Sequence, residues 1–170
     1  MNTMALWQYD IHLLPMSEVV CKFGRLPERV DRKVFDGQDW WLQYQPLDQL
    51  LSRLSGCLAE RPSWTPDIRT WGTEEGNRVD VVLEQGRLVD VFVRFDLRDV
   101  RLDFLDHITS IAKDLGLVVL TPDMRIVEPE ASRLLTLIRT SDAAEFVENP
   151  EEFLCKQQPD HTLDPDTDAQ

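Results

Sequence analysis

The chain has 170 residues, of which 31 are Asp or Glu and 18 are Lys or Arg, so its formal charge at pH 7 is −13. This surplus of negative charge argues against nucleic acid and anionic membrane as direct ligands, because both are polyanions and would be repelled. The length fits one domain with a sizeable core, and the acids are not accompanied by a recognisable nucleophile, metal cage or phosphate loop.

Cysteine usage and hydropathy bear on the compartment. The three cysteines, Cys21, Cys57 and Cys155, are odd in number and far apart, which argues against a disulfide framework or a zinc knuckle. The first residues lack a basic region and a long apolar run, and no stretch approaches the about 18 apolar residues that a membrane span needs. We therefore expect a soluble cytoplasmic protein without a signal peptide.

The first 60 residues of the chain contain two helix signals and one strand signal. Residues 5–14 alternate imperfectly and end at Pro15, which predicts a strand. Ser17 is then expected to cap a short helix that Gly24 ends. Leucines at three- and four-residue spacing predict a second helix over residues 47–58. Over residues 27–45, before this helix, the signals for secondary structure conflict.

The best-defined element is a hairpin formed by residues 78–84 and 88–96. A two-residue loop would set Val81 opposite Asp90 and mix polar with apolar side chains on one face. A three-residue loop, Gln85-Gly86-Arg87, keeps six apolar side chains on one buried face and is therefore predicted. The expected pairs are Leu83 with Val89, Val81 with Val91, and Val79 with Val93.

The second half continues with alternating helices and strands. Asp99 is the expected cap of a helix over 100–115, which Gly116 ends. A buried strand at 117–120 and an edge strand at 125–127 are expected, and then a helix over 130–139. Ser141 or Asp142 would cap a last short helix, and Phe153-Leu154 would dock as a final apolar contact. These elements predict an α+β fold, with a mainly antiparallel sheet and helices packed on one face.

The acidic charge is concentrated near the C-terminus. Residues 141–170 carry nine acids and one base, whereas residues 1–140 carry 22 acids and 17 bases. We predict a single domain over 1–156 and an acidic, disordered tail over 157–170, because that segment is polar and poor in apolar residues. The folded body is then only mildly acidic.

Four carboxylates are expected to gather at one end of the hairpin. Glu74 and Glu75 precede its first strand in a glycine-containing loop, while Asp96 and Asp99 follow its second. Such a cluster suits a divalent cation, or acid–base hydrolysis by separated carboxylates. An ordinary solvated turn explains the same residues more simply, so we assign no catalytic residue, metal ligand or cofactor and treat the four acids as candidate partner-binding residues.

The adjacent Trp40 and Trp41 are further candidates for binding a partner. In an extended segment, adjacent side chains point to opposite sides, so one of the two indoles is expected at the surface. Tryptophan is a favoured anchor residue of protein interfaces.

The segments WGTEEGNRVD at 71–80 and VRFDLR at 93–98 resemble small acidic bacterial proteins of uncharacterised families. Some similar proteins are immunity proteins of polymorphic toxin systems, which block a cognate toxin. The resemblance implies a non-catalytic cytoplasmic protein that occludes a toxin, and an acidic inhibitor would associate rapidly with a basic toxin. Two alternatives stay open: a divalent-metal-dependent hydrolase, and an adaptor that docks a basic partner through its acidic tail.

Overall fold

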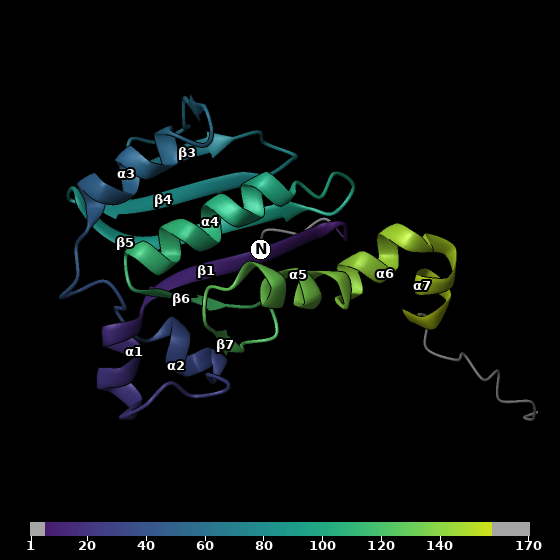
Figure 1. The fold of residues 1–170 in the computed structure, drawn as a ribbon, viewed down its shortest axis with the longest axis horizontal. Helices are drawn as coiled ribbons and strands as arrows, with labels where there is room; N and C mark the ends of the chain where they lie inside the picture. Colours follow the sequence, from purple (N-terminus) through teal and green to yellow (C-terminus); the bar gives the residue numbers. More distant parts are fainter. Residues whose placement is uncertain (1–5, 158–170) are drawn as a thin grey trace, which may run out of the picture.

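The computed structural model describes residues 6–157, and within them one seven-stranded antiparallel sheet organises the fold (Figure 1). The strand order is β2-β3-β4-β5-β1-β6-β7, so β1 and β5 lie near the middle. The strands are β1 (Gln8–Pro15), β2 (Glu60–Arg61), β3 (Ile68–Gly72), β4 (Arg78–Glu84), β5 (Arg87–Asp96), β6 (Leu117–Leu120) and β7 (Ile126–Val127).

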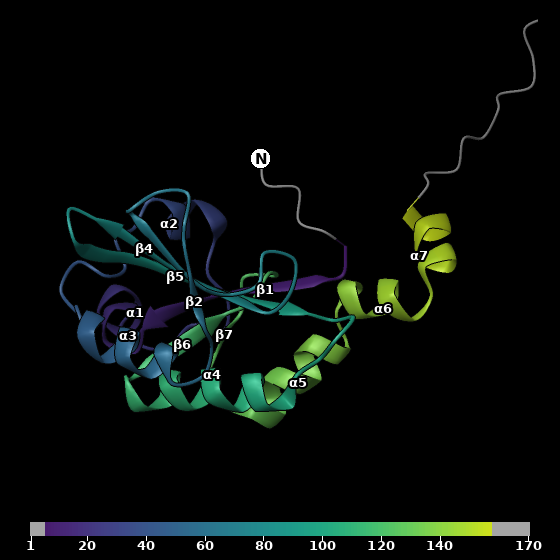
Figure 2. The same ribbon diagram turned by 90° about the horizontal axis from the view of Figure 1, so that it is seen from above.

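Helices pack mainly on one face of this sheet. Figure 2 shows α3, α4 and α5 together on one side, whereas α2 lies on the other side. The predicted α+β class with a mainly antiparallel sheet is therefore confirmed. The helices are α1 (Met16–Phe23), α2 (Arg32–Asp36), α3 (Leu47–Ser55), α4 (Leu102–Asp114), α5 (Ala131–Arg139), α6 (Asp142–Glu148) and α7 (Pro150–Gln157). The predicted tail lies outside the described residues, apart from Gln157, which ends α7.

The core lies between the sheet and the helices on its main face. Alternate residues of β4 and β5 are fully buried there, as the alternating sequence predicted, and Phe95 contacts the ring of Phe104 from α4. The short strand β6 is buried along its whole length, because it lies between β1 and β7 in the sheet and packs under α4. The fully buried strand predicted at 117–120 is confirmed.

The hairpin has a two-residue loop, so the predicted three-residue loop is wrong. Glu84 pairs with Arg87, and both Gln85 and Gly86 have positive φ angles, 50° and 76°. Two positive φ values are typical of a type I′ turn, whose twist matches that of the strands. A register shift between Val82 and Leu83 then restores the predicted pairs Val81–Val91 and Val79–Val93. The bulge replaces the longer loop and leaves Leu88, rather than Val89, on the buried face.

The start of α4 also differs from its prediction. Asp99 does not cap this helix: its N–H donates to the Asp96 carbonyl at 3.2 Å, in a turn that leaves β5. The helix begins two residues later than predicted, at Leu102, with Arg101 before it. Leu102, the first residue of the helix, is 51% exposed.

The second face of the sheet is polar over β4, β5 and the start of β1. The buried Asp10 carboxylate accepts from Arg94 Nε at 3.1 Å, and the ion pair Arg78–Asp80 lies on the same face at 2.9 Å. Towards the end of β1, Phe35 of α2 covers His12 with ring centroids 5.0 Å apart. The Phe35 ring therefore shields this part of the second face from solvent.

Candidate functional site

At the predicted acidic end of the hairpin, the loop before β4 is hydrogen-bonded to the turn after β5. The Asn77 side chain accepts from Asp96 N–H at 3.1 Å and donates to the Asp99 carbonyl at 3.3 Å. Gly72 lets the end of β3 approach the Asn77 backbone closely, because it has a φ of +99° and an added Cβ would lie 2.1 Å from the Asn77 carbonyl oxygen. The sequence therefore correctly placed the loop before β4 beside the turn after β5.

The four carboxylates nevertheless do not converge on one point. Asp96 is buried and bound by Arg98, with Nε and Nη2 at 2.9 and 2.8 Å. Burial alone would raise the pKa of Asp96, but the hydrogen bonds from Arg98 outweigh it and leave that pKa below its usual value. Glu74, Glu75 and Asp99 are exposed. Across residues 6–157, no group of three or more His, Cys, Asp or Glu is placed to hold a metal ion. The geometry lends no support to the metal-hydrolase alternative.

The two tryptophans are both buried, so the expectation that one lies at the surface is wrong. Trp40 is 4% exposed and donates from Nε1 to the Phe35 carbonyl at 3.0 Å, while Trp41 is fully buried beside Tyr44. The segment is a turn rather than a strand, so the side chains need not alternate. The exposed indole belongs instead to Trp64, between β2 and β3.

A different surface combines exposed apolar and acidic side chains, at the helix α6. Figure 1 shows α6 and α7 projecting from the end of the body beyond α5. None of the α6 residues is fully buried, and a cavity flanks the helix on each side. This surface, α6 and α7 with the two cavities, is the candidate functional site.

The first cavity, which we call the Val147 groove, measures about 290 Å³ and opens between α6, α5 and the start of α4. Two of its apolar side chains are exposed, Val100 by 41% and Leu102 by 51%. Val100 directly follows the predicted site residue Asp99, so the acidic turn after β5 borders this groove. Its lining residues are Leu97, Val100, Leu102, Ile138, Arg139, Ala144, Val147 and Glu148.

The helices α6 and α7 give this surface an acidic rim. Residues 141–157 contain five acids and a single base, Lys156. Lys156 pairs with Glu145 at 2.7 Å and with Glu152 at 3.1 Å. In the part of the chain that the structure describes, the other three acids, Asp142, Glu148 and Glu151, have no ion pair, and all three are exposed. Unpaired acids beside exposed apolar side chains suit a partner that is both basic and apolar.

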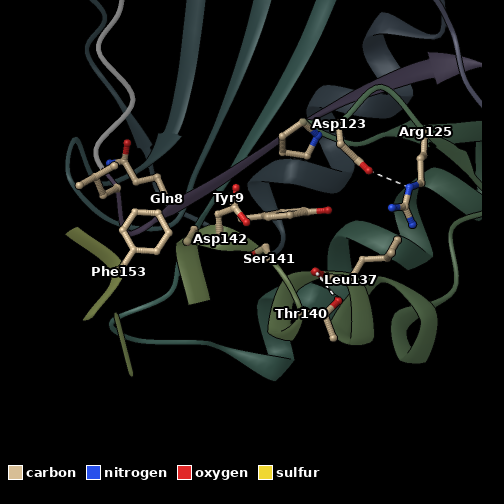
Figure 3. Close-up of a pocket in the computed structure, with 12 residues that line it drawn as sticks. Gln8, Tyr9, Asp123, Arg125, Leu137, Thr140, Ser141, Asp142 and Phe153 are labelled. Carbon is tan, nitrogen blue, oxygen red and sulfur yellow. Dashed lines mark hydrogen bonds and ion pairs between the residues drawn. The ribbon is translucent and has the colours of Figure 1, made fainter. Parts of the chain in front are cut away.

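The second cavity, which we call the Tyr9 cavity, measures about 440 Å³ and lies between β1, the β6–β7 turn and α5–α7 (Figure 3). Tyr9 is only 5% exposed, and its ring crosses the cavity with the hydroxyl toward Asp123, Arg125 and Leu137. Its apolar walls come from Leu6, Pro122, Leu137, Ala143 and Phe153, and its polar lining from Gln8, Asp123, Arg125, Thr140, Ser141 and Asp142.

The Tyr9 hydroxyl has an unusual environment. Within residues 6–157 it makes no hydrogen bond to protein, and it borders the cavity rather than being sealed from solvent. Burial raises its pKa well above the ordinary value, Asp123 raises it further, and Arg125 partly opposes them. The hydroxyl therefore stays protonated at neutral pH and keeps its capacity to donate.

The sequence contained only part of the signal for this site. The charge count pointed to the C-terminal residues. A cap of α6 at Ser141 or Asp142 was predicted, and the hydrogen bond from Ala144 N–H to Ser141 at 3.3 Å shows that it is Ser141. Tyr9 had no distinguishing signal, because its neighbours Arg125 and Asp142 come from segments more than 100 residues away.

Comparison of the chain with protein-family models, with curated proteins and with solved structures finds no match in any of the three. Among the helices of the described residues, none is long and apolar enough to cross a membrane. The functional argument therefore rests on the geometry of this chain.

Proposed function

We propose that this protein is a non-catalytic binding protein that holds a basic, partly apolar segment of a partner protein against α6 and α7. The observation that carries the proposal is the combination at the Val147 groove. Exposed Val100 and Leu102 lie beside Glu148, an exposed acid without an ion pair in the described chain. An apolar centre with a charged rim is the usual anatomy of a protein interface.

An immunity protein that blocks a basic toxin by occlusion is the form of this function that we favour. Such an inhibitor needs a stable surface and fast association rather than catalytic groups, and complementary charge accelerates the encounter. The three cysteines, Cys21, Cys57 and Cys155, are all free thiols. Free thiols are typical of a reducing compartment, which supports the cytoplasm as the place of action.

The experiment uses the full chain as bait, and the test residue is Glu148. Wild type should retain one basic protein from an extract of the source cells, and raised salt should weaken that complex. With the purified partner, Glu148→Lys should weaken affinity about fivefold, the order expected for a lost exposed charge pair. Titration calorimetry measures the change, and co-expression tests whether the protein relieves growth inhibition by the partner.

The matched control is Asp48→Lys, another exposed acid on a helix, but on α3, far from α6 in Figure 1. It should leave affinity unchanged. Equal effects of both variants, an acidic partner, or no retained partner at low salt would each count against the proposal. A chain lacking residues 158–170 tests the adaptor alternative, because that alternative requires the deletion to abolish binding.

A further inference from the structure

We propose that the Tyr9 cavity is a binding site for a carboxylate carried on an apolar group. The carboxylate would accept hydrogen bonds from the Tyr9 hydroxyl and from the terminal guanidinium nitrogens of Arg125. The apolar group would lie against the hydrophobic walls. This inference goes beyond the proposed function and stands without it, because it concerns the other side of α6.

The first argument is the unpartnered donor. A hydroxyl on an otherwise buried side chain needs an acceptor or water on its open side, since leaving it unpaired costs free energy. Tyr9 is 95% buried, yet its hydroxyl reaches into the cavity without a protein partner among the described residues. A ligand acceptor at that point would complete its hydrogen bonding.

The second argument is the charge at the same end of the cavity. Arg125 reaches Asp123 through Nε at 2.7 Å, and within residues 6–157 its terminal nitrogens have no hydrogen bond to protein. Asp123 is already engaged, since it also accepts from Thr121 Oγ1 at 2.6 Å and from Arg29 at 3.4 Å. Two guanidinium groups therefore share one carboxylate, and the terminal nitrogens of Arg125 keep the capacity to donate to an anion that enters the cavity.

The third argument is the shape and lining of the cavity. Its volume of about 440 Å³ lies within the range of small-molecule sites, about 300–1,000 Å³. Leu137 provides apolar surface on the hydroxyl side of Tyr9 and Phe153 provides it further along (Figure 3), and Pro122 also lines the cavity. The exposed acid Asp142 lies toward the opposite end of Tyr9 from the hydroxyl in Figure 3, so it does not crowd the anion end.

The first experiment needs no variant and compares head groups on one chain length. Titration calorimetry with octanoate, octanol and octylamine should show binding of octanoate at least tenfold tighter than binding of the other two. Equal affinities for octanoate and octanol would overturn the proposal, because the carboxylate would then contribute nothing.

A second experiment distinguishes a carboxylate at the C-terminus of a protein from that of a free small acid. A hexapeptide ending in leucine is compared with its C-terminally amidated form and with octanoate. Tighter binding of the free-acid peptide than of octanoate points to the C-terminus of a protein, and the reverse order points to a free small acid. Failure of both probes to bind would overturn the proposal.

Two variants test the named donors. Tyr9→Phe keeps the ring and removes the hydroxyl, and Arg125→Gln removes the charge; each should weaken octanoate binding about tenfold. Arg32→Gln, which changes an exposed arginine of α2 outside both cavities, should leave it unchanged. Urea unfolding of each variant confirms that it folds. The partner assay with Glu148→Lys measures binding at the Val147 groove. A failure of octanoate binding can therefore be distinguished from a failure of the proposed partner binding.

Discussion

At the scale of single residues, the role of a side chain depends more on its surroundings in the fold than on its residue type. Asp96 was a candidate partner-binding acid by sequence, but in the fold Arg98 binds both its oxygens. Tyr9 attracted no attention in the sequence, yet its ring is buried and its hydroxyl reaches a cavity without a hydrogen bond to protein within residues 6–157. Both outcomes depend on which residues the fold brings to within hydrogen-bonding distance.

Asp96 makes stability depend on pH in a defined direction. Its folded pKa is below the unfolded value, so its contribution is present above about pH 4 and is lost as pH falls through the folded pKa. Asp96→Asn should therefore lower the free energy of unfolding by about 1 kcal/mol at pH 7 and by less at pH 3. Urea unfolding at the two pH values measures this.

Arg98→Gln serves as the partner variant for that measurement. Because it removes the donor that lowers the Asp96 pKa, it should flatten the same part of the stability curve. A deficit of Asp96→Asn that stays equal at pH 7 and pH 3 would contradict the assignment.

At the scale of elements, the hairpin shows how a correct pattern led to a wrong loop. The alternation of β4 and β5 indicated the central pairs Val79–Val93 and Val81–Val91, and both are present. The loop length was inferred by assuming an unbroken register. A bulge at Val89 breaks that register, so a tight turn and a consistent buried face coexist.

The tight turn makes a prediction about Gln85. This residue holds a φ of +50°, in the left-handed region that Asn tolerates better than Gln. Gln85→Asn should raise the free energy of unfolding by about 0.5 kcal/mol, whereas Gln85→Val should lower it by about 1 kcal/mol or more. Denaturant unfolding of both variants checks the order, and a three-residue loop would predict little difference between them.

At the scale of the whole molecule, stability and binding capacity lie in different places. The sheet and α4 hold most of the fully buried side chains, whereas α6 has none and lies between two cavities. The described acids without ion pairs on α6 and α7 lie on this less buried part. A surface that must accommodate a partner is often drawn from the less stable end of a fold.

Hydrogen exchange should reveal this difference directly. Amides of β1, β5 and α4 are expected to exchange slowest, through global unfolding, while amides of α6 and α7 exchange through local opening at lower free energy. Exchange followed by mass spectrometry or NMR measures both. Equal protection of α6 and β5 would show that the C-terminal helices belong to the cooperative core.

The sequence by itself determined the α+β class, the antiparallel pairing of β4 with β5, the buried strand β6 and a helix start for α6 at Ser141 or Asp142. These features follow from local periodicity, capping and turn chemistry, which act over a few residues. Only the tertiary structure decided that Trp40 and Trp41 are buried, that the four predicted acids do not converge, and that Tyr9 faces Arg125 across a cavity. Such relations join segments far apart in the chain, and they depend on packing distances that no local pattern encodes.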